Sequence, residues 1–175
     1  MTMPFPQPTL GARDRFFGKY RGEVKGNQDS EGRGRIQVEV PEVRPGVIEW
    51  ALPASPYAGN GVGFFALPPV GANVWVEFEA GNLRVPIWSG CFWLRNEIAA
   101  ADAVPEVVFL KTSQATIRID NAAGEVKIEI GGTSVTLSAS EAKIAAPQIS
   151  LTANGASLSL TPAGLDVLQG ALKVM

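Results

Sequence analysis

The feature that most limits how this chain can fold is a repeat of apolar residues, nine positions apart, in its carboxyl-terminal part. The spacing joins Ile117, Val126, Val135 and Ile144, and then, after a phase shift at Pro147, Ile149, Leu158 and Val167. Around these positions apolar residues alternate with Ser, Thr and charged residues, and small polar turns separate the runs. Alternation with a period of two indicates strands, and a strand-and-turn unit this short is typical of a β-helix or β-prism.

The repeat also provides a set of candidate core residues. They are Ile117, Ile119, Val126, Ile128, Ile130, Val135, Leu137, Ile144, Ile149, Leu151, Leu158, Leu160, Leu165 and Val167. Because each short strand offers only two or three apolar side chains, a single chain cannot surround a core and leaves bare strand edges. Three copies winding about one axis would bury this row at the centre and pair every edge. We therefore predict an intertwined trimeric β-helix, or needle, over residues 112–175.

Two other interpretations of this region stay open. A tail rich in Gly, Ala, Ser and Thr can be disordered, although disorder would not place Ile, Val and Leu at alternate positions. A β-solenoid made by one chain is the second alternative. It would need rungs of roughly twenty residues, and this region would provide only about three of them, with both ends exposed.

The amino-terminal half is built differently, because it holds nearly all the aromatic residues. All four Trp, both Tyr and all but one of the eight Phe precede Arg95. Short alternating runs, broken by Gly and Pro, lie at 20–24, 35–40, 47–52, 73–79 and 83–93. Five or six short strands with no helical period predict a small closed or nearly closed antiparallel barrel over residues 17–95. The oligonucleotide/oligosaccharide-binding (OB) fold has this size and strand count.

The same pattern predicts which side chains lie inside the barrel. Ile36, Val38 and Val40 alternate strictly and are expected to face the core. The large rings of Phe64, Phe65, Trp75 and Phe78 are expected to fill the barrel. The run 83–93 is nearly all apolar, which predicts a strand buried on both faces, with Cys91 as a small buried side chain.

The remaining segments are expected to connect or extend these two parts. Residues 1–16 contain prolines without a period and predict an extended arm, and residues 96–111 predict a linker. No stretch of 18 apolar residues occurs, and the amino terminus has no basic region leading into an apolar one. We therefore expect neither a membrane span nor a signal peptide.

The composition argues against catalysis, cofactors and metal binding. The chain has no histidine and one cysteine, so the commonest general base and metal ligand is absent. The glycine-rich segment 59–64 has Phe64 where a dinucleotide fingerprint needs its third glycine, and no helical pattern follows. No carboxylate pair stands out. We expect a protein that is not an enzyme and that holds no cofactor.

Nucleic-acid binding is also disfavoured by the charge distribution. The formal net charge is −2, and acidic residues are interleaved with the basic ones of the first 35 positions. Binding of a nucleic-acid backbone would need a field of unopposed cations. An alternative function that stays open is a stand-alone OB module that binds nucleic acid or carbohydrate.

An ordered series of motifs in the barrel region resembles the barrel domain of contractile-tail spikes, namely the phage baseplate assembly protein V family and the VgrG proteins of type VI secretion. The motifs are Tyr20–Val24, Gly34–Pro41, Trp50–Ala51, Ala54–Gly59, Gly61–Phe65, Leu67–Gly71, Val74–Asn82, Pro86 and Ser89–Trp93. The series is specific as an ordered whole, whereas no single motif is. In this family an OB barrel precedes a trimeric β-helical needle, and the order of the two regions here is the same.

The resemblance implies a homotrimeric central spike that lies beneath the hub of the tail tube and pierces a target membrane when the sheath contracts. It implies assembly in the cytoplasm into a phage tail, an extracellular injector or a membrane-anchored machine. We expect the chain to depart from fuller relatives in lacking a lysozyme-like domain, a hub domain of its own and a His-x-His metal site. A separate tip protein of the PAAR class is therefore expected to contact Leu172, Val174 and Met175. The alternative is that these three residues only close the trimer's own core.

Overall fold

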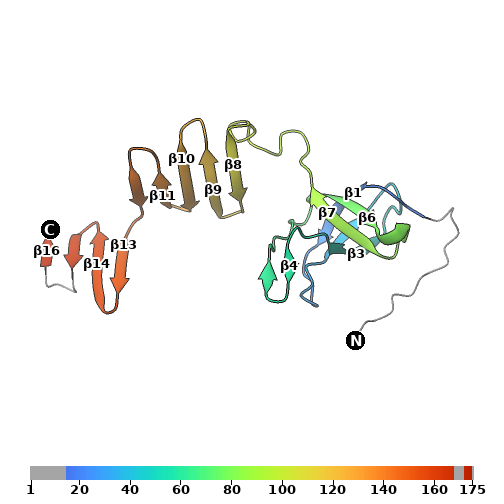
Figure 1. The fold of residues 1–175 in the computed structure, drawn as a ribbon, viewed down its shortest axis with the longest axis horizontal. Coiled ribbons are helices and arrows are strands. Elements are labelled where there is room, and N and C mark those ends of the chain that lie inside the picture. Colours follow the sequence, from blue (N-terminus) through green and yellow to red (C-terminus); the bar gives the residue numbers. More distant parts are fainter. Residues whose placement is uncertain (1–14, 168–171, 175) are drawn as a thin grey trace. The chain divides into compact units, whose positions relative to one another are not determined.

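The computed structural model describes residues 15–167 and 172–174, and all of its regular elements are strands apart from one 3₁₀ turn. The chain divides into two compact units, Met1–Glu97 and Ile98–Met175. Figure 1 shows a barrel in the first unit and rows of short antiparallel strands in the second. Among the described residues, no helix is long and apolar enough to cross a membrane.

The first unit is a closed barrel of five strands in the order β1-β2-β3-β7-β6. The strands are β1 (Tyr20–Gly26), β2 (Ile36–Glu39), β3 (Ile48–Pro53), β6 (Asn73–Phe78) and β7 (Pro86–Cys91). Neighbours pair antiparallel except β3 and β7, which pair in parallel and close the barrel. The 3₁₀ turn Glu79–Gly81 follows β6. This architecture fits an OB fold and confirms the prediction of a closed barrel.

Small aliphatic side chains fill the barrel. Its buried apolar residues are Val24, Ile36, Val38, Val40, Ala51, Val74 and Val76. Strict alternation places these side chains on the inner face of their strands, as predicted for β2. The interior of a five-stranded barrel is narrow, so Val, Ile and Ala are sufficient to fill it.

The predicted aromatic core is wrong in most of its members. Phe64 and Phe65 lie beside a separate hairpin of β4 (Ala58–Gly59) and β5 (Val62–Gly63), and their side chains are 56% and 74% exposed. Trp75 points outward because Val74 and Val76 take the inward positions of β6. Only Phe78 packs against the buried core.

The strand β7 also differs from its prediction. Its first residue, Pro86, is buried, but the rest of the strand is partly exposed and Cys91 is exposed. A run of apolar residues therefore does not mark a strand covered on both faces here. It marks one wall of a barrel, which has a single covered side.

One carboxylate organises the loop between β1 and β2. The side chain of Asp29 is almost fully buried, with 3% exposed, and its carboxylate accepts hydrogen bonds from the backbone N–H groups of Glu31, Arg33 and Arg35. The guanidinium of Arg35 approaches the same carboxylate at 2.7 Å and lies 5.1 Å from the ring centre of Trp50. Arg35 and the backbone donors hold the pKa of Asp29 well below its usual range.

The second unit consists of two sheets of consecutive antiparallel strands. The first sheet runs in the order β12-β11-β10-β9-β8 and the second in the order β13-β14-β15-β16. The strands are β8 (Val107–Lys111), β9 (Ala115–Asp120), β10 (Glu125–Ile130), β11 (Thr133–Leu137), β12 (Ala142–Ala145), β13 (Ile149–Ala153), β14 (Ala156–Thr161), β15 (Gly164–Val167) and β16 (Leu172–Val174). Strand β8 thus occupies the end of the segment 96–111 that was expected to be a linker.

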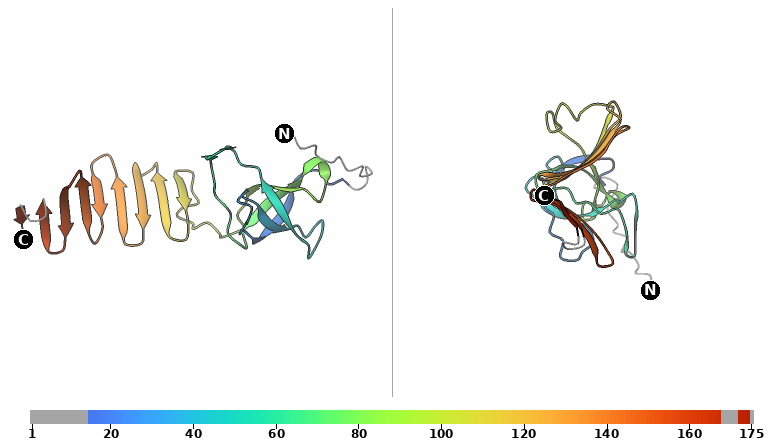
Figure 2. Two further views of the ribbon diagram at one scale, coloured as in Figure 1. Left: turned by 90° about the horizontal axis from the view of Figure 1, so that it is seen from below. Right: turned by 90° about the vertical axis from the view of Figure 1, so that its left-hand side faces the viewer.

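The strands of each sheet pair within the chain, which differs from the prediction that each rung is an open ribbon. Hairpins join each strand to the next from β8 through β12 in one sheet, and from β13 through β16 in the other. Each sheet is a single layer of strands in Figure 2.

We predict that replacing Asp29 with Asn destabilises the barrel at neutral pH and that this difference shrinks in acid. Because the pKa of Asp29 is lower in the folded chain than its ordinary value of 3.8, the ionised carboxylate stabilises the fold fully above about pH 4. That contribution is lost as the pH falls toward the folded pKa, and the variant lacks it at every pH.

Denaturant unfolding of the full chain between pH 7 and pH 2, followed by tryptophan fluorescence, measures this difference. All four tryptophans, at positions 50, 75, 88 and 93, lie in the barrel unit, so the signal reports that unit. The pKa of Glu39 is also lowered, by the Gly46 N–H and by Lys25, but Glu39 is present in both proteins and cancels in the comparison. A difference that stays constant across this pH range would contradict the role assigned to Asp29.

Candidate functional site

The apolar face of the two carboxyl-terminal sheets is the most unusual surface in the described part of the chain. In the first sheet, the register aligns two rows of side chains across all five strands. One row is Val108, Ile119, Val126, Leu137 and Ala142, and the other is Leu110, Ile117, Ile128, Val135 and Ile144. Residues in register on neighbouring strands lie on the same side of a sheet, so both rows share one face.

The second sheet repeats this arrangement. One row is Ile149, Leu160 and Leu165, and the other is Leu151, Leu158 and Val167. Two apolar positions per strand, two residues apart, thus continue through both sheets. The face that carries these rows is called the double apolar row below.

The opposite face is polar from β9 onward, whereas in β8 it carries Phe109, in register with Arg118. In the first sheet, Arg118, Lys127, Thr136 and Lys143 follow one another in register across β9 to β12. In the second sheet, Ser150, Ser159 and Asp166 do the same across β13 to β15. One face is therefore suited to solvent and the other is not.

Nothing in the described part of the chain covers the double apolar row. Within residues 98–167 no residue is buried. Eleven Val, Ile and Leu side chains of β8 to β14 are between 37% and 59% exposed, among them Ile128 at 43% and Leu151 at 59%. A contiguous apolar surface of this extent marks an interaction site.

The structure brings most of the predicted needle residues together. The fourteen residues expected to form the trimer core all lie in β9 to β15, and Ile130 joins its two neighbours on the same side of β10. Sequence analysis missed Val108 and Leu110, which extend both rows into β8. Their alternate spacing indicates a strand, but these two residues lie in the segment 96–111 that is predicted to be a linker.

The residues expected to contact a tip protein lie at the end of the chain. Leu172 and Val174 are in register with Val167 and Leu165, which places them in line with the two rows. Met175 lies outside the described residues.

The barrel carries two surface features of a different kind. The first is the aromatic hairpin, which exposes Tyr57 and Val62 as well as Phe64 and Phe65. The second is a stack on the outer wall, where the guanidinium of Arg21 lies 5.4 Å from the ring centre of Trp75 and 5.0 Å from that of Phe92. Both features are typical of contact surfaces, because aromatic and Arg side chains are enriched there.

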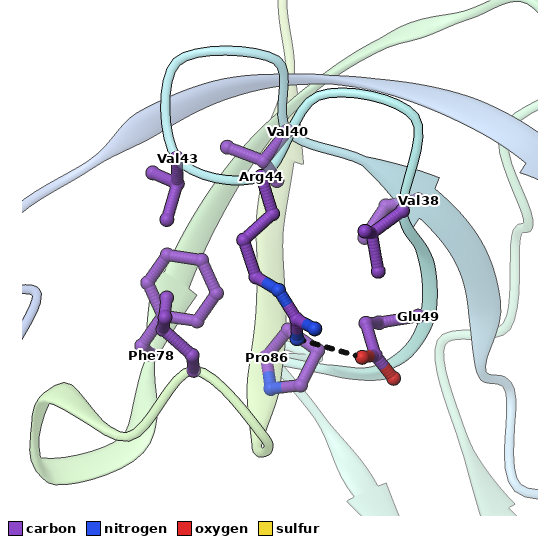
Figure 3. Close-up of a pocket in the computed structure, with 9 residues that line it drawn as sticks. Val38, Val40, Val43, Arg44, Glu49, Phe78 and Pro86 are labelled. Atoms are coloured by element: carbon purple, nitrogen blue, oxygen red, sulfur yellow. Dashed lines mark hydrogen bonds and ion pairs between the residues drawn. The ribbon is translucent and has the colours of Figure 1, made fainter.

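The barrel also has a small hollow, but it is too small for a substrate. Val38, Val40, Val43 and Phe78 contribute to its apolar wall, and Arg44 and Glu49 form an ion pair of 3.0 Å beside it (Figure 3). Its free volume of about 20 Å³ holds little more than one water molecule. Within the described residues, no group of three or more His, Cys, Asp or Glu side chains is placed to hold a metal ion.

Comparison with known protein families gives a match that covers the barrel. Residues 20–93 match the family model of the type VI secretion system/phage-baseplate injector OB domain. No curated protein matches the chain. The matched segment begins with β1 and ends just after β7, so it spans the closed barrel and leaves both sheets outside. The match supports the contractile-tail spike family and a baseplate-associated structural role for this chain.

Proposed function

We propose that the chain is a non-enzymatic central spike of a contractile injection machine and acts as a homotrimer. Its barrel attaches beneath the hub of the tail tube, and its two sheets build a needle that is driven into the target envelope. One observation carries the proposal. A chain whose barrel matches an injector OB domain continues into single-layer sheets with an uncovered double apolar row.

The energy available from covering this face supports association of copies. Full burial of a Val, Ile or Leu side chain stabilises by about 1.5–3 kcal/mol, and the eleven exposed Val, Ile and Leu side chains of β8 to β14 are still about half accessible. Covering them is worth on the order of 10 kcal/mol per chain. Bringing two proteins together costs about 4–15 kcal/mol, so a shared core among several copies outweighs this cost.

The narrowness of the apolar face favours three copies around one axis. Each strand offers only two or three apolar positions, so the strip is narrow compared with the covered face of an ordinary β-sandwich. Three narrow strips can face one another around an axis, and each is then covered by the other two. The polar rows, with Arg118, Lys127 and Lys143, stay on the outside.

The proposal extends to the two ends of the needle. The barrel side contacts the hub protein, and the strand β16, at Leu172–Val174, leads toward a tip protein of the PAAR class. The alternative for this end is that its apolar residues close the trimer's own core. The trimer assembles in the cytoplasm into a phage tail or injection particle and touches a target membrane only during contraction.

The alternative of a nucleic-acid-binding barrel receives little support from the charges. Lys19, Lys25, Arg33 and Arg35 each form an ion pair with at least one carboxylate. A barrel that binds a single strand needs a groove of cations that are free to face phosphates. Here most of the basic side chains near β1 and β2 are already neutralised by neighbours.

We expect the purified full chain to have three times the mass of one 18.5 kDa chain, and a chain that ends after Pro105 to be a monomer. The shortened chain keeps the closed barrel and loses both apolar faces. Light scattering coupled to gel filtration measures both masses, and tryptophan fluorescence verifies that the barrel is folded. A monomeric full chain would overturn the needle and leave the barrel as a binding module.

A carboxylate introduced on either face of the first sheet should affect the association of copies differently. Ile128→Asp places a carboxylate in the middle of the double apolar row, whereas Thr136→Asp places the same group on the polar face between Lys127 and Lys143. Burying an unpaired carboxylate costs several kcal/mol, so we expect Ile128→Asp to shift the trimer toward monomers. Thr136→Asp should keep the parent mass. Equal masses for both variants and the parent would show that this face is not the contact between copies.

The proposed role as a spike can be tested on purified contractile particles that have a sheath. An epitope tag on the chain should label purified sheathed particles at the baseplate end of the tube in immunogold electron microscopy. Deletion of the gene should abolish particles or their contraction-dependent killing. Sheathed particles that form and act normally without the chain would contradict the proposed function, whatever its oligomeric state.

A further inference from the structure

The two sheets of the second unit separate at one short connection. Strand β12 is the last strand of the first sheet and β13 is the first strand of the second, and the two are consecutive in the chain. Among the described strands, no ladder joins β12 to β13. Each of these strands therefore has one edge whose N–H and C=O groups have no strand partner within residues 15–167 and 172–174.

The length of the connection does not explain this separation. Residues 146–148 link β12 to β13, and the turns of residues 121–124 and 138–141 are longer and still close hairpins. Pro147 lies in this connection, where its fixed φ and missing N–H restrict the backbone. A proline alone does not prevent a hairpin, however, since Pro162 lies in the two-residue turn that joins β14 to β15.

The residue after Pro147 is attached to the second sheet. The side-chain amide of Gln148 donates hydrogen bonds to Ser150 Oγ at 3.2 Å and to Ser159 Oγ at 3.4 Å. Both serines lie on the polar face of β13 and β14. The chain thus leaves one sheet at Ala145 and is fixed to the next by residue 148.

Both free edges can accept another strand. Neither β12 nor β13 contains Pro or a bulge, and β13 has no charged side chain. Unprotected edges of this kind pair with other strands, and natural proteins normally block them. Both strands also end the double apolar row, so a strand added at either edge must continue it.

We propose that β12 of one copy pairs with β13 of a neighbouring copy, so that the segment 146–148 is a crossover at which the chain passes from one sheet to the next. The inference rests on the proposed homotrimer and specifies where its copies exchange strands. The contact is head-to-tail, because two different edges meet. It closes into a ring when each copy gives its β13 to one neighbour and receives β13 from the other.

The apolar rows determine which residues of β12 and β13 lie on the same face when these strands pair. A shift of one residue would turn every apolar side chain of one strand to the wrong face. Ala142 and Ile144 must therefore share a face with Ile149 and Leu151. Lys143 then lies on the polar face with Ser150 and Thr152.

Cysteine cross-linking between two differently tagged, co-expressed full chains tests the exchange. Both chains carry Cys91→Ser, because the native thiol is exposed and would form unrelated disulfides. One chain carries Lys143→Cys, and the other carries Ser150→Cys or, in a separate preparation, Thr152→Cys. Mild oxidation should produce a band with both tags at twice the mass of one chain.

Two control pairs test whether cross-linking requires that both cysteines lie on the same face of the sheet. Lys143→Cys combined with Leu151→Cys places the thiols on opposite faces and should give no cross-linked band. Thr136→Cys and Lys143→Cys in one chain should form a disulfide within that chain, because these residues are in register in β11 and β12. This second control verifies that a thiol at position 143 can react.

The outcomes distinguish a failure of the strand exchange from a failure of the proposed function. A doubly tagged band from the same-face pairs but not from the opposite-face pair supports the exchange. A trimer by light scattering that gives no such band with either same-face pair overturns the exchange and leaves the proposed function standing. A single chain with Lys143→Cys and Ser150→Cys that links only within itself also overturns the exchange. A monomer by light scattering overturns the proposed function itself.

Discussion

A single layer of strands cannot cover its own apolar face, and the second unit of this chain depends on that constraint. The ladders from β8 to β12 and from β13 to β16 satisfy the backbone inside each sheet, but they place two rows of Val, Ile and Leu on one surface. In the barrel the sheet curves until its inner face covers itself. In the second unit the sheets stay open, so the cover has to come from outside the chain, and we propose that it comes from two further copies.

Both units place Val and Ile on the apolar face of their sheets, and they differ in their content of aromatic rings. The barrel encloses seven small aliphatic side chains and keeps its large rings on or near the surface, where Trp75, Phe92 and Arg21 stack. The second unit has stiff, branched side chains and almost no aromatics. Rings are wide and would hold narrow sheets apart, whereas Ile and Val pack closely along a shared axis.

Much of the barrel core and of the apolar face of the second unit could be predicted from the sequence, because the alternation of apolar and polar residues determines which side chains share a strand face. Ile36 and Val38 were placed in the barrel core on this basis, and Ile117 and Ile128 on one side of the second unit. Alternation does not reveal whether an apolar segment folds over the core. Phe65 and Cys91 were therefore placed inside, although the first lies beside a separate hairpin and the second at the end of a wall strand. The anchoring role of Asp29 was also missed, since it depends on three backbone N–H groups that only the folded loop brings together.

The regular spacing of the hairpins has a consequence for how such a chain can change in length. From Ile117 to Val135 the sequence advances by two strands and returns to the same direction and the same face. Insertion or loss of one such hairpin would lengthen or shorten a sheet by about 9–10 Å, since neighbouring strands lie about 4.7–4.9 Å apart. The apolar rows would stay continuous and the barrel would not be altered. The length of the second unit can therefore evolve in discrete steps, independently of the barrel.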